Sequence, residues 1–224
     1  MARQQTEEKE VWKPKTKLGK KVAKGQVTDI IQALDSRYTI MEEEIVDQLT
    51  NLDEEVILIG GTPGKGGGIR RTVSKRTCRM HKSGGRYSSK AMVVLGDRRD
   101  VIGIGEGQAN DTRAAIEDAT RNAKLDLIKV QRGNGSWEDK GNDNSSIPFK
   151  VSGKSGSVEV ELIPAPRGTG LAASDEIKKL LELAGIENIY VQARGQTRTR
   201  ENLLKATFNA LDKLNEYKHN GDSE

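Results

Sequence analysis

Hydrophobic and polar positions along the chain form two successive blocks, each of which predicts strands followed by helix. In the first block, strand patterns cover residues 70–80, 86–95 and 101–107, and a helical pattern runs from 112 to 130. Asp111 or Thr112 is the expected N-cap of this helix. Its apolar stripe consists of Ile116, Ala119, Ala123, Leu127 and Val130. The first block is therefore predicted as βββα.

The second block predicts a ββαβα arrangement. Apolar residues alternate with glutamates over 158–162, and residues 189–191 form another short strand. Ser174 is placed to cap a helix that ends at Gly185, and a final helix is expected over 201–217. Together the two blocks predict the α+β fold class.

Segments of low hydrophobicity suggest where domains begin and end. We expect an N-terminal region over 1–68, a first domain over 69–138, a polar linker over 139–146, a second domain over 147–218 and a tail over 219–224. Within the N-terminal region, the arm WKPKTKLGKKVAKG is expected to order only on a partner. The run GGTPGKGGG fails the spacing of a Walker A loop and is expected to be a flexible basic loop.

Charge is segregated along the chain although the net charge is only +4. Nine lysines and arginines and no acid lie between Lys65 and Lys90, and six lysines without an acid lie between Lys13 and Lys24. Solubility is better served by mixed charge, so these blocks indicate a polyanionic partner. Cys78 is the only cysteine, and no apolar run reaches the length of a membrane span; these features predict a soluble cytoplasmic protein with no membrane partner.

The run VIGIGEGQAN at 101–110 has glycines at alternate positions. A dinucleotide loop needs the spacing G-x-G-x-x-G, and here the third glycine comes one residue early. In a strand, Gly103, Gly105 and Gly107 lie on one face, which then carries no side chains. We expect a helix, another strand or a polynucleotide to approach this face closely.

An enzyme is the weaker alternative. PAPRGTGLAAS at 164–174 resembles the phosphate loop of small-molecule kinases of the galactokinase and mevalonate kinase group, with Gly168 and Gly170 freeing amides for phosphate. Thr169, Leu171 and Ala172 depart from that pattern. RNA is the favoured polyanion, and because aromatic residues make up only 4% of the chain, base stacking should be limited.

Five blocks in order carry a resemblance to a known family: KSGGRYSSKAMVVLGDRRDVIGIGEGQA, AIEDATRNAKLDLIKV, GKSGSVEVELIPAPRGTGL, LELAGIENIYVQARGQTRT and KATFNAL. They resemble the small-subunit ribosomal protein S-five family in its archaeal and eukaryotic form, over roughly residues 12–214. Some archaeal members carry a cysteine-rich stretch where this chain has Asn134 and Asp139, so any metal site built there is absent. The segment 60–68 matches no block of the family.

The resemblance implies a double-stranded-RNA-binding-like βββα domain followed by a ββαβα domain whose βαβ crossover is left-handed. It implies a structural role without catalysis or cofactor: binding small-subunit ribosomal RNA near the decoding region, beside the channel through which messenger RNA enters, and supporting accuracy. The implied neighbours are ribosomal proteins of the fourth and eighth families, and also the third. A free RNA-binding or RNA-remodelling factor remains the alternative.

Residues predicted to contact RNA come from the basic blocks, from the loop that matches the family at 82–86, and from later arginines. They are Lys13, Lys15, Lys17, Arg70, Arg71, Lys75, Arg76, Arg79, Lys82, Gly84, Gly85, Arg86, Lys90, Arg98, Arg99, Arg132, Trp137, Arg167, Arg194, Arg198 and Arg200. No catalytic or metal-binding residue is predicted.

Overall fold

A computed structural model describes residues 12–35, 38–138 and 144–216. The chain divides into two compact units, residues 1–50 and 51–224, which are described separately. Most of the predicted linker and the tail lie outside the described residues. Within the described ranges, no helix is both long and apolar enough to cross a membrane. The mixed α+β class predicted from the sequence is confirmed.

The first unit contains three short helices: α1 (Lys17–Ala23), α2 (Ile30–Leu34) and α3 (Glu43–Leu49). Thr16 caps α1, because its Oγ1 accepts a hydrogen bond from the amide of Gly19 at 3.0 Å. Each helix buries apolar side chains; those buried in this unit are Leu18, Val22, Ile30, Ala33, Ile40, Ile45 and Val46. The expectation that the basic arm orders only on a partner is wrong for α1, since a cap and buried apolar residues stabilise it within the chain.

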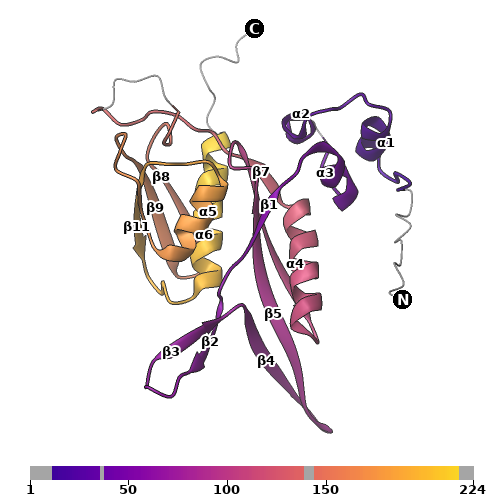
Figure 1. Ribbon diagram of the computed structural model, residues 1–224, viewed down its shortest axis with the longest axis vertical. Coiled ribbons are helices and arrows are strands. Elements are labelled where there is room, and N and C mark those ends of the chain that lie inside the picture. The colour runs from indigo at the N-terminus through magenta and orange to yellow at the C-terminus, as the bar shows by residue number, and fades with distance from the viewer. Residues whose placement is uncertain (1–11, 36–37, 139–143, 217–224) are drawn as a thin grey trace, which may run out of the picture. The chain divides into compact units, whose positions relative to one another are not determined.

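The larger unit begins with a five-stranded antiparallel sheet (Figure 1). Its order is β1 (Asp53–Val56), β5 (Gly84–Gly96), β6 (Val101–Ala109) and β7 (Leu127–Lys129). The fifth strand, β4 (Ser74–His81), lies on the same edge of β5 as β1: β1 pairs with the end of β5, and β4 pairs with its first part. Because β5 is 13 residues long, its first part and β4 extend beyond the other strands as a two-stranded arm. We call residues 74–91 the β4–β5 arm.

Helix α4 (Thr112–Leu125) lies on the glycine face of β6. A Cβ added to Gly105 would lie 2.1 Å from the carbonyl oxygen of Ala119, and one added to Gly107 would lie 2.1 Å from that of Ala115. Gly103 meets the backbone of Ala123 in the same way. Three glycines on the strand thus face three alanines on the helix. A helix, one of the three expected possibilities, occupies this face.

The predicted helix over 112–130 ends earlier than expected. Asp126 is its C-cap, and residues 127–129 form β7, which pairs with Val101–Gly103 of β6. Leu127 and Val130 are buried, as the helical stripe required. The spacing of the apolar residues fits a helix. The segment forms a strand instead because it pairs with the free edge of β6.

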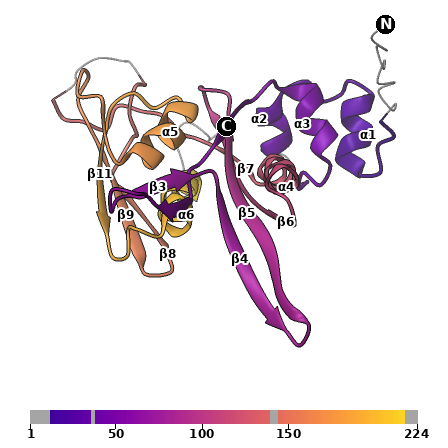
Figure 2. The same ribbon diagram turned by 60° about the horizontal axis from the view of Figure 1, so that its bottom comes forward.

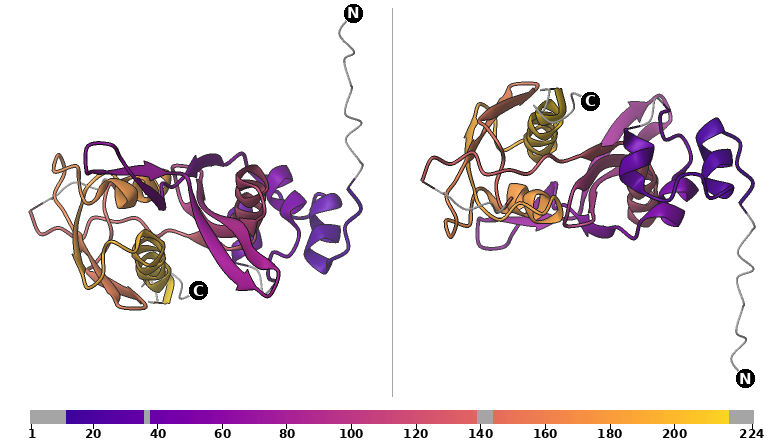
Figure 3. Two further views of the ribbon diagram at one scale, coloured as in Figure 1. Left: turned by 90° about the horizontal axis from the view of Figure 1, so that it is seen from below. Right: turned by 90° about the horizontal axis from the view of Figure 1, so that it is seen from above.

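The second sheet has the order β10 (Leu171–Ala172), β11 (Ile189–Arg194), β9 (Val158–Pro164) and β8 (Val151–Ser155). β10 runs parallel to β11 and the other pairs are antiparallel. Helices α5 (Asp175–Leu183) and α6 (Arg200–Asp212), followed by the 3-10 helix η1 (Lys213–Glu216), lie between the two sheets (Figures 1 and 3). One apolar core therefore joins the faces of both sheets across α5 and α6.

A separate hairpin occupies the glycine-rich segment that was expected to be a flexible loop. β2 (Gly60–Pro63) pairs with β3 (Ile69–Thr72), and its turn is closed by a hydrogen bond from the amide of Gly64 to the carbonyl of Gly68 at 2.7 Å. Gly60 packs against the backbone of Ser74, where a Cβ would lie 2.0 Å from the carbonyl oxygen. The expectation of an irregular loop is wrong because these glycines serve a turn and a close approach between strands.

Candidate nucleic-acid interface

The β4–β5 arm presents two chemically different faces. Directly paired residues of an antiparallel ladder share a face, so the register fixes which side chains lie together. The basic face, as we call it, is formed by Lys75, Thr77, Arg79 and His81 of β4 with Gly84, Arg86, Ser88 and Lys90 of β5. The opposite face carries Arg76, Cys78, Met80, Gly85, Tyr87 and Ser89.

On the basic face, Arg79 lies directly opposite Arg86. Both side chains are exposed, and neither has an acidic partner among the described residues. Like charges at directly opposed positions destabilise a ladder. An anion bound across this pair would remove the repulsion, so the arrangement favours a phosphate ligand.

The arm ends in a tight turn formed by Lys82 and Ser83. Gly84 follows with a φ of 117°, a conformation that favours glycine. Lys82, Gly84, Gly85 and Arg86, all predicted to contact RNA, are exposed. Because Gly84 and Gly85 carry no side chains, a polynucleotide backbone could approach the arm closely at these two positions.

The opposite face of the arm offers a small stacking surface that the sequence did not reveal. The guanidinium of Arg76 lies 4.1 Å from the centroid of the Tyr87 ring, which is 55% exposed. Met80 beside the turn is 76% exposed, and Trp137, in a separate loop, is 88% exposed. A planar base could stack on each of these side chains.

Most of the other predicted basic residues on described segments also lie at the surface. Lys13, Lys15 and Lys17 are exposed in the first unit. In the second unit the exposed ones are Arg70, Arg71, Lys75, Arg98, Arg99, Arg167, Arg194 and Arg198. These positions leave their guanidinium and ammonium groups accessible to a polyanion.

Several of the predicted RNA-binding residues form ion pairs with carboxylates among the described residues. Arg132 pairs with Asp100 at 3.0 Å, and Arg98 pairs with Asp53 at 2.8 Å. Arg200 is only 15% exposed and binds both Glu176 at 2.5 Å and the carbonyl of Leu58 at 2.6 Å. Lys75, whose Nζ lies 3.5 Å from Glu201, and Lys90 belong to the network described next. Their positions assign these residues a structural part in addition to the predicted contact with RNA.

Lys90 joins the base of the arm to α6. Its Nζ lies 2.9 Å from Glu201 and 3.1 Å from Glu106, and Lys205 completes the network at 2.9 Å from Glu106. Partial burial acts to lower the pKa of Lys90, but the hydrogen bonds and charges of the two carboxylates outweigh it and raise the pKa. Burial likewise acts to raise the pKa of Glu106, and its two lysine partners hold that pKa below the ordinary value. Lys90 and Glu106 are thus both held in their charged forms at neutral pH.

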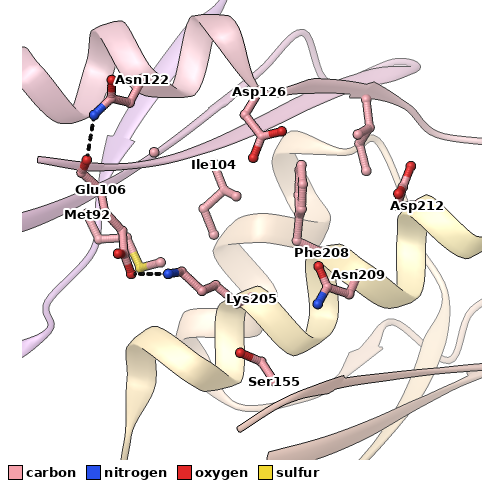
Figure 4. Close-up of a pocket in the computed structure, with 12 residues that line it drawn as sticks. Met92, Ile104, Glu106, Asn122, Asp126, Ser155, Lys205, Phe208, Asn209 and Asp212 are labelled. Atoms are coloured by element: carbon pink, nitrogen blue, oxygen red, sulfur yellow. Dashed lines mark hydrogen bonds and ion pairs between the residues drawn. The ribbon is translucent and has the colours of Figure 1, made fainter.

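A cavity of about 440 Å³ lies beside this network (Figure 4). Ile104 and Phe208 contribute apolar side chains to it, while Asp126 at the end of α4 and Asp212 at the end of α6 lie along it. Burial and the negative charge of Asp212 raise the pKa of Asp126. In the described part of the chain, no group of three or more acidic, histidine or cysteine residues is placed to hold a metal ion.

The loop that resembled a kinase phosphate loop is already bonded. The side-chain oxygen of Asn188, a buried residue, accepts hydrogen bonds from the amides of Gly168 and Gly170, each at 3.0 Å. These are the two amides that the kinase alternative required for phosphate. β10 also separates the loop from α5, so the loop does not open directly into the helix. The geometry therefore does not support a kinase.

Comparison with known proteins decides the family. The model described as "Ribosomal protein S5, N-terminal domain" matches residues 70–131, and "Ribosomal protein S5, C-terminal domain" matches residues 153–222. The chain belongs to the ribosomal protein S5 family. The resemblance expected from the five sequence blocks is thereby confirmed, and as a member of this family of structural proteins the chain is not an enzyme.

Archaeal relatives in the S5 family match nearly the whole chain. "Small ribosomal subunit protein uS5" of Methanocaldococcus jannaschii is 43% identical over 205 residues, covering 91% of this chain and 88% of the relative. The protein of the same name from Nanoarchaeum equitans is 44% identical over 208 residues, covering 92% and 88%. That of Methanothermobacter thermautotrophicus is 41% identical over 210 residues, covering 93% and 90%. The first unit and strand β2 lie outside both family-model matches.

Proposed function

We propose that this protein is a structural constituent of the small ribosomal subunit in the cytoplasm and binds ribosomal RNA through the basic face and turn of the β4–β5 arm. The single observation that carries the RNA contact is the pair Arg79 and Arg86, two directly opposed cations without an acidic partner among the described residues. Membership in the S5 family and relatives named for the small subunit support the assignment.

The finer arrangement belongs to the same proposal. We assign the β4, β5, β6 and α4 segment to a double-stranded-RNA-binding-like domain over 69–138, and the second sheet with α5 and α6 to a ββαβα domain over 147–218 with a left-handed βαβ crossover. The order of elements along the chain supports this division. The intervening residues 139–146 act as a linker.

The place within the subunit follows from the family resemblance. We propose that the arm contacts RNA near the decoding region, that neighbouring proteins belong to the fourth and eighth families and also the third, and that the protein lies beside the channel for incoming messenger RNA. Through these contacts it would support the accuracy of translation.

Sedimentation of a cell lysate through a sucrose gradient tests the proposal. A structural constituent travels with the small subunit and stays there at moderate salt, because many phosphate contacts must break together. A free RNA-binding or RNA-remodelling factor, the alternative function, is released under the same conditions. Recovery of the chain only in fractions without ribosomal RNA would refute both.

A further inference from the structure

The hairpin formed by β2 and β3 creates a cleft with the second sheet's helices. The cleft has a volume of about 340 Å³ and is lined by Arg71 of β3, Ser174 and Glu176 at the start of α5, and Ala193, Thr197, Arg198, Arg200 and Leu203. Figure 2 shows the hairpin beside the second sheet and α6. Segments more than a hundred residues apart in the sequence thus supply its walls. We call this the β3 cleft.

The charged groups in the β3 cleft do not cancel. Arg200 and Glu176 form a shielded ion pair, their side chains being 15% and 14% exposed, and together they contribute no net charge. Arg71 and Arg198 are exposed, and neither has an acidic partner among the described residues. The cleft therefore carries two uncompensated guanidinium groups.

Two hydroxyl groups complement these cations. Ser174 occupies the N-cap position of α5, but its side chain makes no capping hydrogen bond, contrary to the expectation from the sequence. Thr197 also lines the cleft, and its hydroxyl has no partner among the described residues. Two guanidiniums and two hydroxyls that can all donate toward one space form a donor set suited to a phosphate group.

The backbone holds this donor set in place. In the loop before α6, the amide of Thr197 donates to the carbonyl of Gly195 at 3.0 Å, and the amide of Thr199 donates to that of Gln196 at 3.0 Å. On the other wall of the cleft, Arg71 is part of β3 and pairs with Gly61 of β2. Both arginines are thus carried by ordered segments.

We propose that the β3 cleft binds a backbone phosphate of RNA, as a second contact separate from the β4–β5 arm. The ligand class rests on the proposed function. RNA is favoured over a free phosphate ion because the same hairpin carries two more exposed cations, Lys65 in its turn and Arg70 on the other face of β3, and only a polyanion can contact cations outside the cleft as well. The residues that line the cleft lie within the two segments that the family models match, 70–131 and 153–222.

The full-length protein and a transcript of small-subunit ribosomal RNA provide the test, with affinity measured by filter binding between 50 and 200 mM KCl. Each lost phosphate contact reduces the slope of log affinity against log salt by about 0.7 to 0.9. For Arg71→Ala/Arg198→Ala we expect a slope shallower by about 1.5. The control Arg113→Ala/Arg121→Ala removes the same charge from α4 and should leave the slope within about 0.3 of that of the wild type.

A hydroxyl variant separates a built site from diffuse charge. Ser174→Ala removes a hydrogen bond without changing charge, so affinity should fall roughly two- to tenfold with an unchanged slope. Equal effects of the cleft pair and the α4 pair, or no effect of Ser174→Ala, would overturn the proposal while leaving RNA binding by the arm intact. Wild-type protein that does not bind the transcript would instead overturn the proposed function, and the cleft with it.

Inorganic phosphate at constant ionic strength distinguishes the two sources of the anion. Resonances of the arginine Nε–H groups, followed by NMR, should shift for Arg71 and Arg198 on addition of a short RNA. Saturation of the same shifts by phosphate at low millimolar concentration would identify a site for the free ion and overturn the assignment to RNA. Circular dichroism confirms that each variant is folded.

Discussion

Single residues show how little space separates α4 from its sheet. Gly103, Gly105 and Gly107 let the helix backbone lie where side chains would otherwise be, and the alanines opposite them keep the approach close. Gly153 repeats the arrangement in the second sheet, since a Cβ there would lie 2.1 Å from the carbonyl oxygen of Ala206 in α6. Each sheet is therefore packed onto a helix through glycine.

Gly105→Ala should destabilise the protein by about 3 kcal/mol, because the added methyl group meets helix backbone that cannot rotate away. Gly66→Ala is the control: no atom lies within 4 Å of its Cβ position, and the change should stay within about 0.5 kcal/mol. Urea unfolding followed by circular dichroism measures both. A small effect of Gly105→Ala would show that helix and sheet are farther apart than described.

Glu42 organises the first unit. Its carboxylate accepts hydrogen bonds from Trp12 Nε1 at 2.9 Å, the amide of Lys15 at 3.0 Å and the amide of Thr16 at 2.5 Å. Desolvation acts to raise the pKa of Glu42, but these hydrogen bonds outweigh it and lower the pKa from its ordinary value of 4.5. The ionised form is thus the one that stabilises the fold.

Glu42→Gln should weaken the first unit at pH 7, because an amide accepts hydrogen bonds less strongly than a carboxylate. A folded-state pKa below 4.5 contributes stability above pH 4.5 that is lost as the pH falls through the lowered value, so wild type and variant should converge in acid. With Trp137→Phe as background, Trp12 fluorescence reports unfolding of this unit. A difference that does not shrink at all as the pH falls below 4.5 would contradict this role.

At the scale of elements, the β4–β5 arm places two exposed arginines of like charge directly opposite each other. The ladder places Arg79 against Arg86 instead of against an acid, although acids are frequent elsewhere in the chain. A two-stranded arm selected only for stability would not carry such a pair. Under the proposed function, an RNA phosphate bound between the two arginines would offset this repulsion.

Arg79→Glu should therefore change stability and binding in opposite directions. A cross-strand ion pair with Arg86 replaces the repulsion and should stabilise the arm by about 0.5 kcal/mol, seen as slower amide hydrogen exchange over residues 77–88. RNA affinity should fall, and the salt slope should become shallower by about 1.5. Arg113→Glu on α4 supplies the same change in charge as a control; an equal loss of binding there would argue against the arm.

The sequence predicted most elements but not their limits. The strands of the arm, β6, β9 and the buried faces of α5 and α6 follow from local periodicity, which needs no knowledge of neighbours. The end of α4 and the strand β7 do not, because the partner of residues 127–129 is an edge about 25 residues earlier. The hairpin at 60–72 was missed because glycine-rich composition resembles a loop, whereas the pairing with β3 depends on register.

At the scale of the whole larger unit, residues 51–224, each site is formed by residues that are far apart in the sequence. Lys90 and Glu201, 111 residues apart, form an ion pair at the base of the arm, and Arg71 and Arg198 both line the β3 cleft. Basic clustering in the sequence predicted these residues as RNA contacts. It could not show which of them also have carboxylate partners, since those partners come from other elements.

Glu106→Gln tests the network that joins the first sheet to α6. The substitution removes a negative charge that pairs with Lys90 and Lys205. It should lower the free energy of unfolding by about 1–2 kcal/mol at pH 7, a small value because the groups are partly exposed to solvent. Because the pKa of Glu106 is lowered in the folded state, the difference from wild type should begin to shrink near pH 4.5 and should be lost as the pH falls through the lowered pKa. Glu117→Gln, in an exposed pair with Arg113, should have little effect at any pH in the same urea titrations.

The salt dependence of RNA binding tests the central claim most directly, namely that the arm neutralises ribosomal RNA phosphates. For the isolated wild-type protein and a small-subunit ribosomal RNA transcript, log affinity should fall with log salt at a slope of about −4 or steeper. Arg79→Ala/Arg86→Ala should make that slope shallower by about 1.5. A flat response of the wild type, or a double variant that binds as the wild type does, would contradict the account.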